Sequence, residues 1–123
     1  GGINYLITDA GMHTLIRPAL YKAHHEIESV SGNTEKPTDY TIAGPICESS
    51  DIFGKNINLP QQQIGNLLII KDTGAYGKVM ASNYNSRGLP KEILVKDNNF
   101  FVIHKPLSIK EYIDQDRIPD WLV

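Results

Sequence analysis

Arg17 and Tyr21 form the first pair of residues whose types and spacing could do chemistry. They are four residues apart, so both project from one face if this segment is helical. A guanidinium fork beside a phenol suits a carboxylate ligand. Such pairs are common on helix surfaces, however, and the pair alone favours a surface arginine stacked on a tyrosine.

Cys47, the only cysteine, lies in the polar, turn-rich segment 44–51 (GPICESSD). A lone cysteine is usually a small buried apolar residue. Its polar neighbours make this a poor place for a core residue, and a free thiol is mostly protonated at neutral pH and can donate a proton. The residues alone leave open whether Cys47 is structural or a proton donor.

Tyr76 lies between Gly74 and Gly77 in the segment 72–77 (DTGAYG). Glycines let the backbone approach a ligand closely, and N–H groups at the start of a possible helix could bind an anion such as phosphate. By itself the pattern is weak, and a plain glycine turn is the commoner explanation.

The histidines of the chain, His13, His24, His25 and His104, do not predict a metal site. Adjacent residues of a strand point to opposite faces, which separates His24 from His25. The H-E-x-x-H spacing of a zinc-binding helix is absent from the sequence, and a second cysteine is absent too.

The elements that must position these residues are short. The patterns predict strands at 3–8, 25–30, 40–43 and 67–71, a hairpin of 92–96 with 100–104, and helical turns at 15–21 and before residue 81. Ser108 and Glu111 fit a capping box that starts a last helix. Short strands without alternating long helices favour a mainly β fold, a small antiparallel β-barrel or sandwich with Greek-key-like connections.

The composition is that of one globular domain, residues 1–123. Hydrophobic residues are 41% of the chain, charged residues 21%, and the net charge is −2. This leaves no basic surplus for nucleic acid, and no run reaches the roughly 20 apolar residues of a membrane helix. A single cysteine excludes an internal disulfide. The start Gly1-Gly2-Ile3, without Met or a signal-peptide pattern, leads us to expect a cytoplasmic protein of which this chain is a piece.

Five blocks, in this order, closely resemble the C-terminal part of the diaminopimelate decarboxylase family, over about residues 3–95. They are DAGM at 9–12, LIRPALY at 15–21, GPICES at 44–49, GAYG at 74–77 and SNYNSR at 82–87. The resemblance implies decarboxylation of meso-2,6-diaminopimelate to L-lysine and CO2, the last step of lysine biosynthesis, with pyridoxal 5'-phosphate as cofactor. It also implies an N-terminal (β/α)8 barrel, which needs about 250 residues and is absent from this chain. That barrel would carry the Schiff-base lysine, so this chain alone is expected to be inactive.

The resemblance also assigns roles to individual residues. It implies that Arg17 and Tyr21 bind substrate, that Cys47 is the catalytic proton donor, and that Glu48 holds a substrate ammonium group. It implies that Tyr76 contacts both the cofactor phosphate and the substrate. It further implies a homodimer in which the cysteine loop enters the neighbouring subunit's site. A diamino diacid needs both a cationic fork and an anion, and Arg17 and Glu48 supply one each.

Two alternatives stay open at this point. Related ornithine, arginine and carboxynorspermidine decarboxylases share the architecture, although ornithine-type relatives tend to have Asp after the cysteine, where this chain has Glu48. The other alternative is a non-catalytic β-domain that serves as a binding or assembly module, which the missing cofactor lysine would explain.

Overall fold

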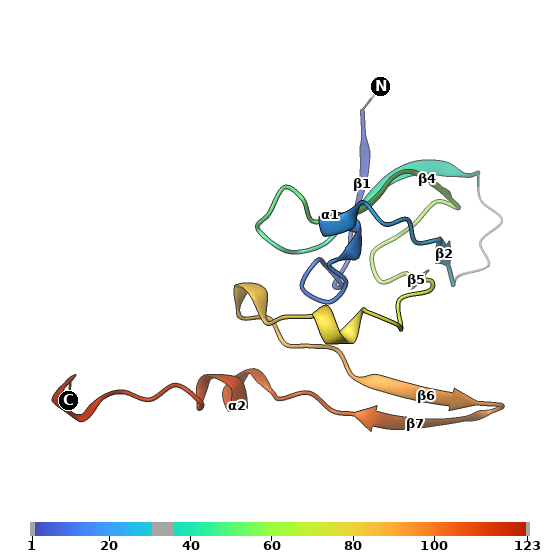
Figure 1. Cartoon of the computed structure of the whole chain (residues 1–123). Coiled ribbons are helices and arrows are strands. Elements are labelled where there is room, and N and C mark those ends of the chain that lie inside the picture. Colours follow the sequence, from blue (N-terminus) through green and yellow to red (C-terminus); the bar gives the residue numbers. More distant parts are fainter. Residues whose placement is uncertain (1, 31–35, 123) are drawn as a thin grey trace. The chain divides into compact units, whose positions relative to one another are not determined.

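The computed structural model describes residues 2–30 and 36–122 (Figure 1). The chain divides into two compact units, Gly1–Ser82 and Asn83–Val123.

A three-stranded sheet forms the centre of the first unit. It contains β1 (Asn4–Ile7), β3 (Thr38–Ala43) and β4 (Ile52–Leu59), in the order β1-β3-β4. The β3–β4 pair is antiparallel, but β1 and β3 run parallel, with Asn4 opposite Tyr40 and Ile7 opposite Ala43. Parallel strands require a long crossover, and here the chain passes through a helix and another strand between them.

The crossover contains helix α1 (Arg17–Tyr21) and strand β2 (Ile27–Ser29), and β2 forms a second, two-stranded sheet with the later strand β5 (Leu68–Ile70). The β2–β5 pair is antiparallel. Helix α1 has Pro18 in its first turn, where proline is tolerated because its missing N–H would have no helical partner. It ends at Lys22, which adopts a left-handed conformation with φ of 55°. A single 3-10 turn, η1 (Lys78–Met80), replaces the short helix expected before residue 81.

The core of the first unit lies between these two sheets. Strands from both of them contribute, and Ile42 of β3 is fully buried. The core cluster consists of Leu15, Ile27, Tyr40, Ile42, Phe53 and Leu59. The Tyr40 hydroxyl keeps a polar partner, because it accepts the backbone N–H of Gln62 at 3.1 Å.

Strand β4 was absent from the sequence-based prediction, although it is the longest strand described. Gly54 and Asn56 interrupt its apolar pattern, and Asn56 has a positive φ of 55°. The register between β3 and β4 also shifts twice near Ile42, so the alternation of inward and outward side chains is broken. The strand is nevertheless anchored by the buried Phe53 and Leu59.

The second unit is built from a hairpin and short helical segments. Strand β6 (Glu92–Lys96) pairs antiparallel with β7 (Asn99–His104), which confirms the predicted hairpin. It is preceded by η2 (Tyr84–Ser86) and followed by α2 (Ile109–Ile113) and η3 (Asp120–Leu122). The predicted capping box is also confirmed, because Ser108 Oγ accepts the N–H of Glu111 and Glu111 Oε2 accepts the N–H of Ser108.

The hairpin carries apolar side chains on both of its faces, and within this structure they are exposed. Their exposed fractions run from 39% at Val102 to 74% at Phe100. The set consists of Ile93, Leu94, Val95, Phe100, Phe101, Val102 and Ile103. An isolated two-stranded hairpin is marginally stable in water.

The predicted fold class is confirmed: the chain is mainly β with short helices. The strands of the described residues form three separate sheets, so the closed barrel that the strand count allowed is not present in residues 2–30 and 36–122. The predicted sheet was antiparallel throughout, and the parallel β1–β3 pair departs from that prediction. In the same described ranges, every helix is too short or too polar to cross a membrane.

Candidate functional site

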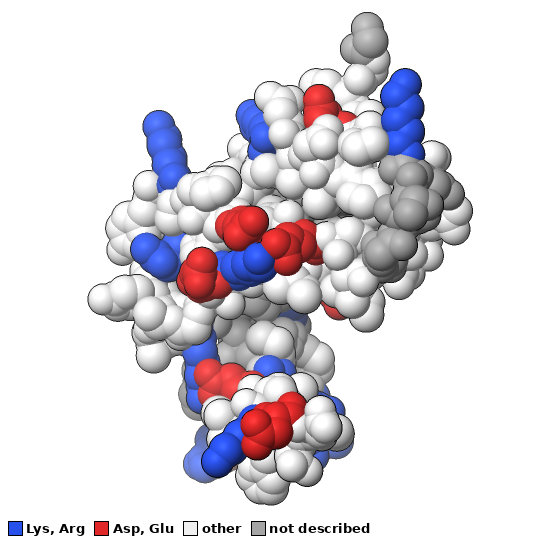
Figure 2. Space-filling model, turned by 90° about the vertical axis from the view of Figure 1, so that its right-hand side faces the viewer, with Lys and Arg blue, Asp and Glu red and all other residues white. Residues whose placement is uncertain are grey.

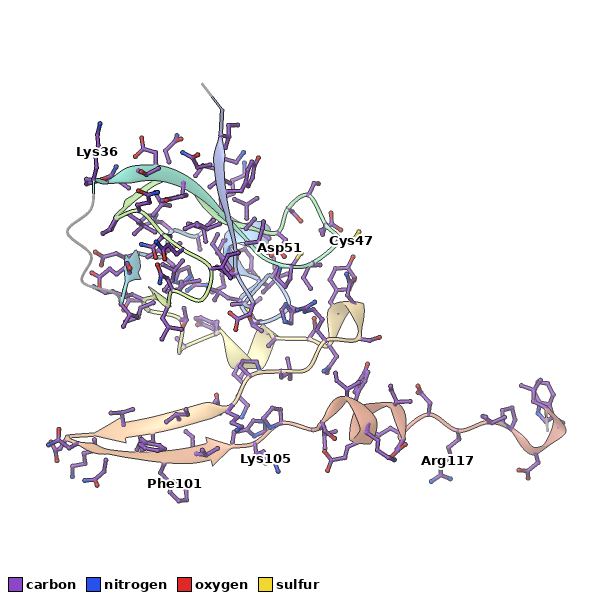
Figure 3. The ribbon with its side chains drawn as sticks, turned by 180° about the vertical axis from the view of Figure 1, so that it is seen from behind. Lys36, Cys47, Asp51, Phe101, Lys105 and Arg117 are labelled. Carbon is purple, nitrogen blue, oxygen red and sulfur yellow. The ribbon has the colours of Figure 1, made fainter. Side chains whose placement is uncertain are left out.

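Cys47 and Glu48 lie on the exposed loop that connects β3 to β4 (Figure 3). The predicted irregular segment is confirmed here, but it is held by its own backbone. The Gly44 N–H donates to the Asp51 carbonyl at 3.0 Å, and the Asp51 N–H donates to the Glu48 carbonyl at 3.0 Å. The residue before the cysteine, Ile46, is buried. The thiol therefore stands exposed on a loop whose base is fixed.

Asp51 is the residue that fixes this base, and no role was predicted for it from the sequence. It is only 3% exposed. Its Oδ2 accepts the N–H of Ile46 at 2.8 Å, and its Oδ1 accepts the N–H of Met12 at 2.6 Å. The carboxylate thus joins the cysteine loop to the segment that leads into α1. The sequence feature that could have indicated this role is an acidic residue at the end of a turn, directly before a strand.

Two glycines make room for this carboxylate. A Cβ atom placed on Gly44 would lie 2.3 Å from Asp51 Oδ2 and 2.5 Å from Gly11 Cα. A Cβ atom on Gly11 would lie 2.9 Å from Asp51 Oδ2 and 2.7 Å from Pro45 Cδ. The two backbone segments therefore meet at a distance that no larger residue permits.

We expect Gly44→Ala to destabilise the protein by about 1–3 kcal/mol, because the new methyl group meets backbone that cannot rotate away. Urea unfolding measures the change. Gly74→Ala is the matched control, since a Cβ on Gly74 would meet nothing within 4 Å. Equal free energies of unfolding for the two variants would contradict the close approach at Gly44.

Arg17 is held against Tyr76, which is far from it in sequence. The guanidinium carbon lies 5.5 Å from the centroid of the Tyr76 ring, a cation–π distance. The ring that stacks on Arg17 is therefore not that of Tyr21, which is 61% exposed on the same helix. This contact joins two of the predicted site residues, Arg17 and Tyr76, and orients the charged fork.

The glycine turn around Tyr76 presents that ring. The Gly77 N–H donates to the Thr73 carbonyl at 3.0 Å, and a Cβ on Gly77 would lie 2.3 Å from the same oxygen. The Gly77 N–H is therefore used within the turn, and the three residues of η1 are too few to form an anion-binding helix end. The geometry favours the plain turn over the backbone phosphate cradle. Tyr76 itself is 56% exposed.

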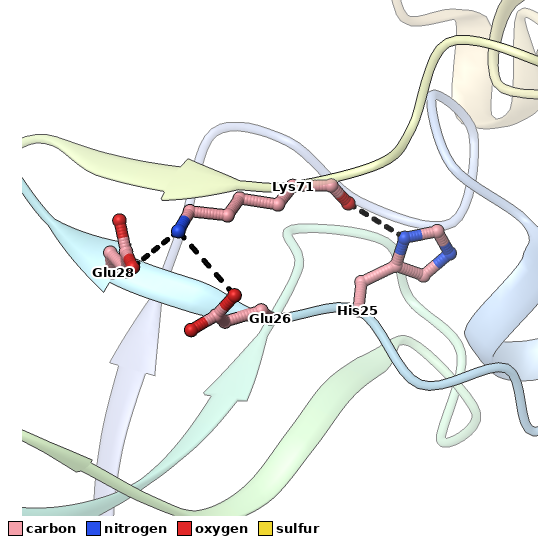
Figure 4. Close-up of polar contacts among 4 residues, drawn as sticks. All are labelled: His25, Glu26, Glu28 and Lys71. Atoms are coloured by element: carbon pink, nitrogen blue, oxygen red, sulfur yellow. Dashed lines mark hydrogen bonds and ion pairs between the residues drawn. The ribbon is translucent and has the colours of Figure 1, made fainter.

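Lys71 is bound by two carboxylates, that of Glu28 on β2 and that of Glu26 directly before this strand (Figure 4). Its ammonium group contacts Glu28 and lies 3.4 Å from Glu26 Oε2. The hydrogen bond that Lys71 donates to Glu28 raises the pKa of Lys71 above its ordinary value of 10.5. Partial desolvation opposes this shift, and the hydrogen bond donated to Glu26 adds to it. A lysine that attacks a cofactor carbonyl must first lose its proton, so this environment disfavours that role for Lys71. On the face drawn in Figure 2, acidic and basic side chains are likewise interspersed.

His25 has a structural position next to this lysine. The residue is 4% exposed, and its Nδ1 lies 2.9 Å from the carbonyl oxygen of Lys71 (Figure 4). Because that oxygen can only accept, Nδ1 carries the proton in this contact. The imidazole therefore ties the end of β5 to the start of β2.

A family model described as "Pyridoxal-dependent decarboxylase, C-terminal sheet domain" matches residues 1–74, more than half of the chain. The chain belongs to this family. Among the predicted site residues of this decarboxylase domain, Arg17, Tyr21, Cys47 and Glu48 lie inside the match, and Tyr76 lies two residues beyond it.

Individual decarboxylases agree with this assignment. Diaminopimelate decarboxylase of Archaeoglobus fulgidus is 39% identical over 98% of this chain. A crystal structure of diaminopimelate decarboxylase from Methanocaldococcus jannaschii with L-lysine matches 97% of the chain at 39% identity, with a TM-score of 0.91. A lysine/ornithine decarboxylase from Vibrio vulnificus, complexed with cadaverine, matches 66% of it at 26% identity, with a TM-score of 0.59.

The chain spans a minor part of each of these decarboxylases. It covers 29% of the Archaeoglobus protein, 27% of the Methanocaldococcus structure and 22% of the Vibrio structure.

Proposed function

We propose that this chain is the C-terminal domain of a diaminopimelate decarboxylase, which converts meso-2,6-diaminopimelate to L-lysine and CO2. The observation that carries the proposal is the 39% identity over 98% of the chain to a protein named for that activity. The lysine/ornithine decarboxylase is less similar to this chain and matches only 66% of it. It therefore gives weaker support to ornithine as the substrate than the diaminopimelate decarboxylases give to meso-diaminopimelate.

Arg17 and Glu48 supply the two charges that the substrate requires. The guanidinium of Arg17 binds the substrate carboxylate that stays, through a two-pronged contact that its planar fork suits. Its stacking on Tyr76 limits the rotamers of a long side chain, so less freedom is lost on binding. Tyr21 lines the same helix face, and Glu48 binds the distal ammonium group from the cysteine loop.

Cys47 returns the proton that replaces the leaving carboxylate. The Cys47 side chain is exposed on its loop. Exposure is required here because the substrate is held mainly by other parts of the enzyme. In a homodimer this loop reaches the neighbouring subunit's site. That arrangement explains why the proton donor stands on the surface of its own domain.

Tyr76 is the residue of this chain that fits the pyridoxal phosphate. Its phenol can donate a hydrogen bond to a phosphate oxygen. When bound, the cofactor supplies the electron sink that lets a carboxylate leave as CO2. The side chains of this domain orient the substrate and deliver a proton to the carbon that loses the carboxylate. The lysine that carries the cofactor lies outside this chain.

A substrate panel tests the proposed function. The complete protein, supplied with pyridoxal phosphate, is expected to release CO2 from meso-diaminopimelate with a specificity constant at least about 100-fold above those for ornithine, arginine and carboxynorspermidine, because each of the last three leaves a charged group of the site unpaired. Preference for ornithine would assign the alternative decarboxylase, and no activity on any of them would favour a binding module. The 123-residue chain alone is expected to be inactive.

We expect Tyr76→Phe to weaken retention of pyridoxal phosphate by about 10–100-fold, because one hydrogen bond to a charged oxygen, worth about 1.5–3 kcal/mol, is lost. The KM for substrate should stay within about twofold of the wild-type value, because the aromatic ring that stacks on Arg17 remains. Absorbance titration of the cofactor into the apoprotein measures the first effect. Tyr76→Leu is the comparison: it should add a rise in KM, and identical kinetics for Phe and Leu would contradict the role of the stacked ring.

A further inference from the structure

The β6–β7 hairpin of the second unit has polar residues only at its two ends. Glu92 pairs with His104 at one end, and Lys96 pairs with Asn99 beside the turn. The three pairs between them are apolar, namely Ile93 with Val102, Leu94 with Phe101 and Val95 with Phe100. Strands with continuous apolar runs, rather than alternating ones, are typical of strands buried on both faces. The hairpin therefore has the sequence of a buried element.

Both faces of this hairpin are open in the structure. Residues directly opposite each other share a face and successive residues alternate, so Phe100 and Phe101 lie on opposite faces. Phe100 is 74% exposed and Phe101 is 70% exposed. An isolated hairpin is marginally stable in water, and folded proteins rarely leave apolar patches of more than a few hundred Å2 uncovered. A partner is therefore expected on each face.

A second copy of the hairpin would cover only one of the two faces. Each face offers on the order of 300–400 Å2 of apolar surface, about half of the roughly 800 Å2 that one partner contributes to a stable interface. A twofold axis places one face against its own equivalent, and the opposite face stays open. A further contact of the same kind would extend the assembly without closing it. Contact between two hairpins thus does not account for both faces.

A longer polypeptide of this family offers a partner large enough for both faces. The chain spans 29% of the Archaeoglobus relative and 27% of the Methanocaldococcus structure, and the matching family model describes a C-terminal domain. Most of the length of these relatives thus lies outside the match. A segment that is covalently attached is present at a high effective concentration, so a small area on each face is sufficient to hold it.

We infer that the two apolar faces of the β6–β7 hairpin are the docking surface for the polypeptide that precedes this domain in the same subunit. The inference rests on the proposed function only in treating the chain as one domain of a longer decarboxylase. The second unit then attaches the domain to the rest of its own subunit, whereas the cysteine loop of the first unit is proposed to reach the neighbouring one.

Phe100→Ala and Phe101→Ala in the complete protein test the inference, because each shortens the largest side chain of one face. Hydrogen exchange followed by mass spectrometry is the measurement. Exchange should become at least about tenfold faster in the hairpin and in a segment of the preceding polypeptide, which loses its contact. Exchange in the peptide that contains the core residue Ile42 should stay within about twofold of the wild-type rate.

Asn98→Ala is the matched control. Asn98 is exposed in the turn between the two strands, so its truncation removes a side chain from the same hairpin without changing either face. Its exchange pattern should match that of the wild type. A loss in the preceding polypeptide as large as that of the two phenylalanine variants would contradict docking through the faces.

Mixed dimers identify the subunit that supplies the partner. Isotope-labelled Phe100→Ala subunits are refolded together with unlabelled wild-type subunits, and mass spectrometry resolves the two sets of peptides. Faster exchange in the preceding polypeptide should be confined to the labelled subunit. Faster exchange there in the unlabelled subunit would assign this face to a second copy. A loss of protection limited to the hairpin itself would overturn the docking surface.

These measurements need no substrate, so they separate the inference from the proposed function. The expected pattern in a protein that decarboxylates none of the substrates would support the docking surface and reject the function. Unchanged exchange in both phenylalanine variants of an active decarboxylase would overturn the docking surface alone.

Should the alanine variants not fold, hydroxyl-radical oxidation of the wild-type protein decides. Phe100 and Phe101 must be oxidised at least about tenfold more slowly in the complete protein than after unfolding in urea, and this protection must persist on dilution to single subunits. Equal rates would overturn the inference, and protection that is lost on dilution would assign the faces to a second copy.

Discussion

Cys47→Ala is expected to lower the kcat of the complete decarboxylase by about 100-fold or more, the usual contribution of a positioned proton donor. The methyl group of alanine keeps the loop backbone and removes only the donor. The KM for meso-diaminopimelate should stay within about twofold of the wild-type value, because the charged groups proposed to bind substrate are unchanged. Initial rates of CO2 release at saturating and limiting substrate give both constants.

Ser49→Ala is the control for this experiment. Ser49 lies on the same exposed loop, two residues after the cysteine, and also loses one polar atom on substitution. Its kcat should match that of the wild type. Normal turnover in Cys47→Ala would remove the cysteine from the mechanism, and an equal loss in both variants would point to loop disorder instead.

Arg17→Lys is expected to raise the KM for meso-diaminopimelate by about 10–100-fold, which corresponds to the loss of one hydrogen bond between charged groups, about 1.5–3 kcal/mol. The positive charge remains, but an ammonium group cannot reproduce the two parallel N–H bonds of a guanidinium fork. It also loses the planar contact with the Tyr76 ring. Steady-state kinetics at constant pH and salt measures the change.

The choice of substrate makes this test specific. If Arg17 binds the carboxylate that stays, the variant should lose nothing further on a diamino acid that lacks this carboxylate, such as ornithine. Arg117→Lys makes the same exchange at an exposed arginine and should leave KM unchanged. A parallel loss on both substrates would show that Arg17 acts elsewhere.

The parts of the fold that local sequence determines were predicted correctly. The hairpin of β6 and β7 follows from strand-forming residues on either side of a polar turn. The capping box at Ser108 depends on two residues three positions apart. Helix α1 occupies the last part of the predicted helical segment. Each of these elements takes its main signal from neighbouring residues.

Strands β1, β2, β3 and β5 were also predicted, but two features that depend on distant pairing were not. Strand β4 contains Gly54 and Asn56, which weaken its local pattern, and it is stabilised by pairing with β3 and by burial of Phe53 and Leu59. The parallel direction of β1 and β3 is set by the crossover between them. Local periodicity carries no information on either point.

The site shows the same division. Residue types and the resemblance selected Arg17, Tyr21, Cys47, Glu48 and Tyr76, and their roles stay predictions. The stacking of Arg17 on Tyr76 was not foreseen, because nothing in the spacing relates residues so far apart. Asp51 was noted only as a polar neighbour of the cysteine. Its importance comes from burial and from two backbone partners, which a sequence does not display.

The close approach of Gly11 to Gly44 has a consequence for attempts to change substrate preference. Here a graft of the cysteine loop would fail unless the recipient also offers a residue without a side chain at position 11, since a Cβ there would lie 2.7 Å from Pro45 Cδ. A change of substrate specificity that replaces the cysteine loop must therefore also replace the segment around Gly11.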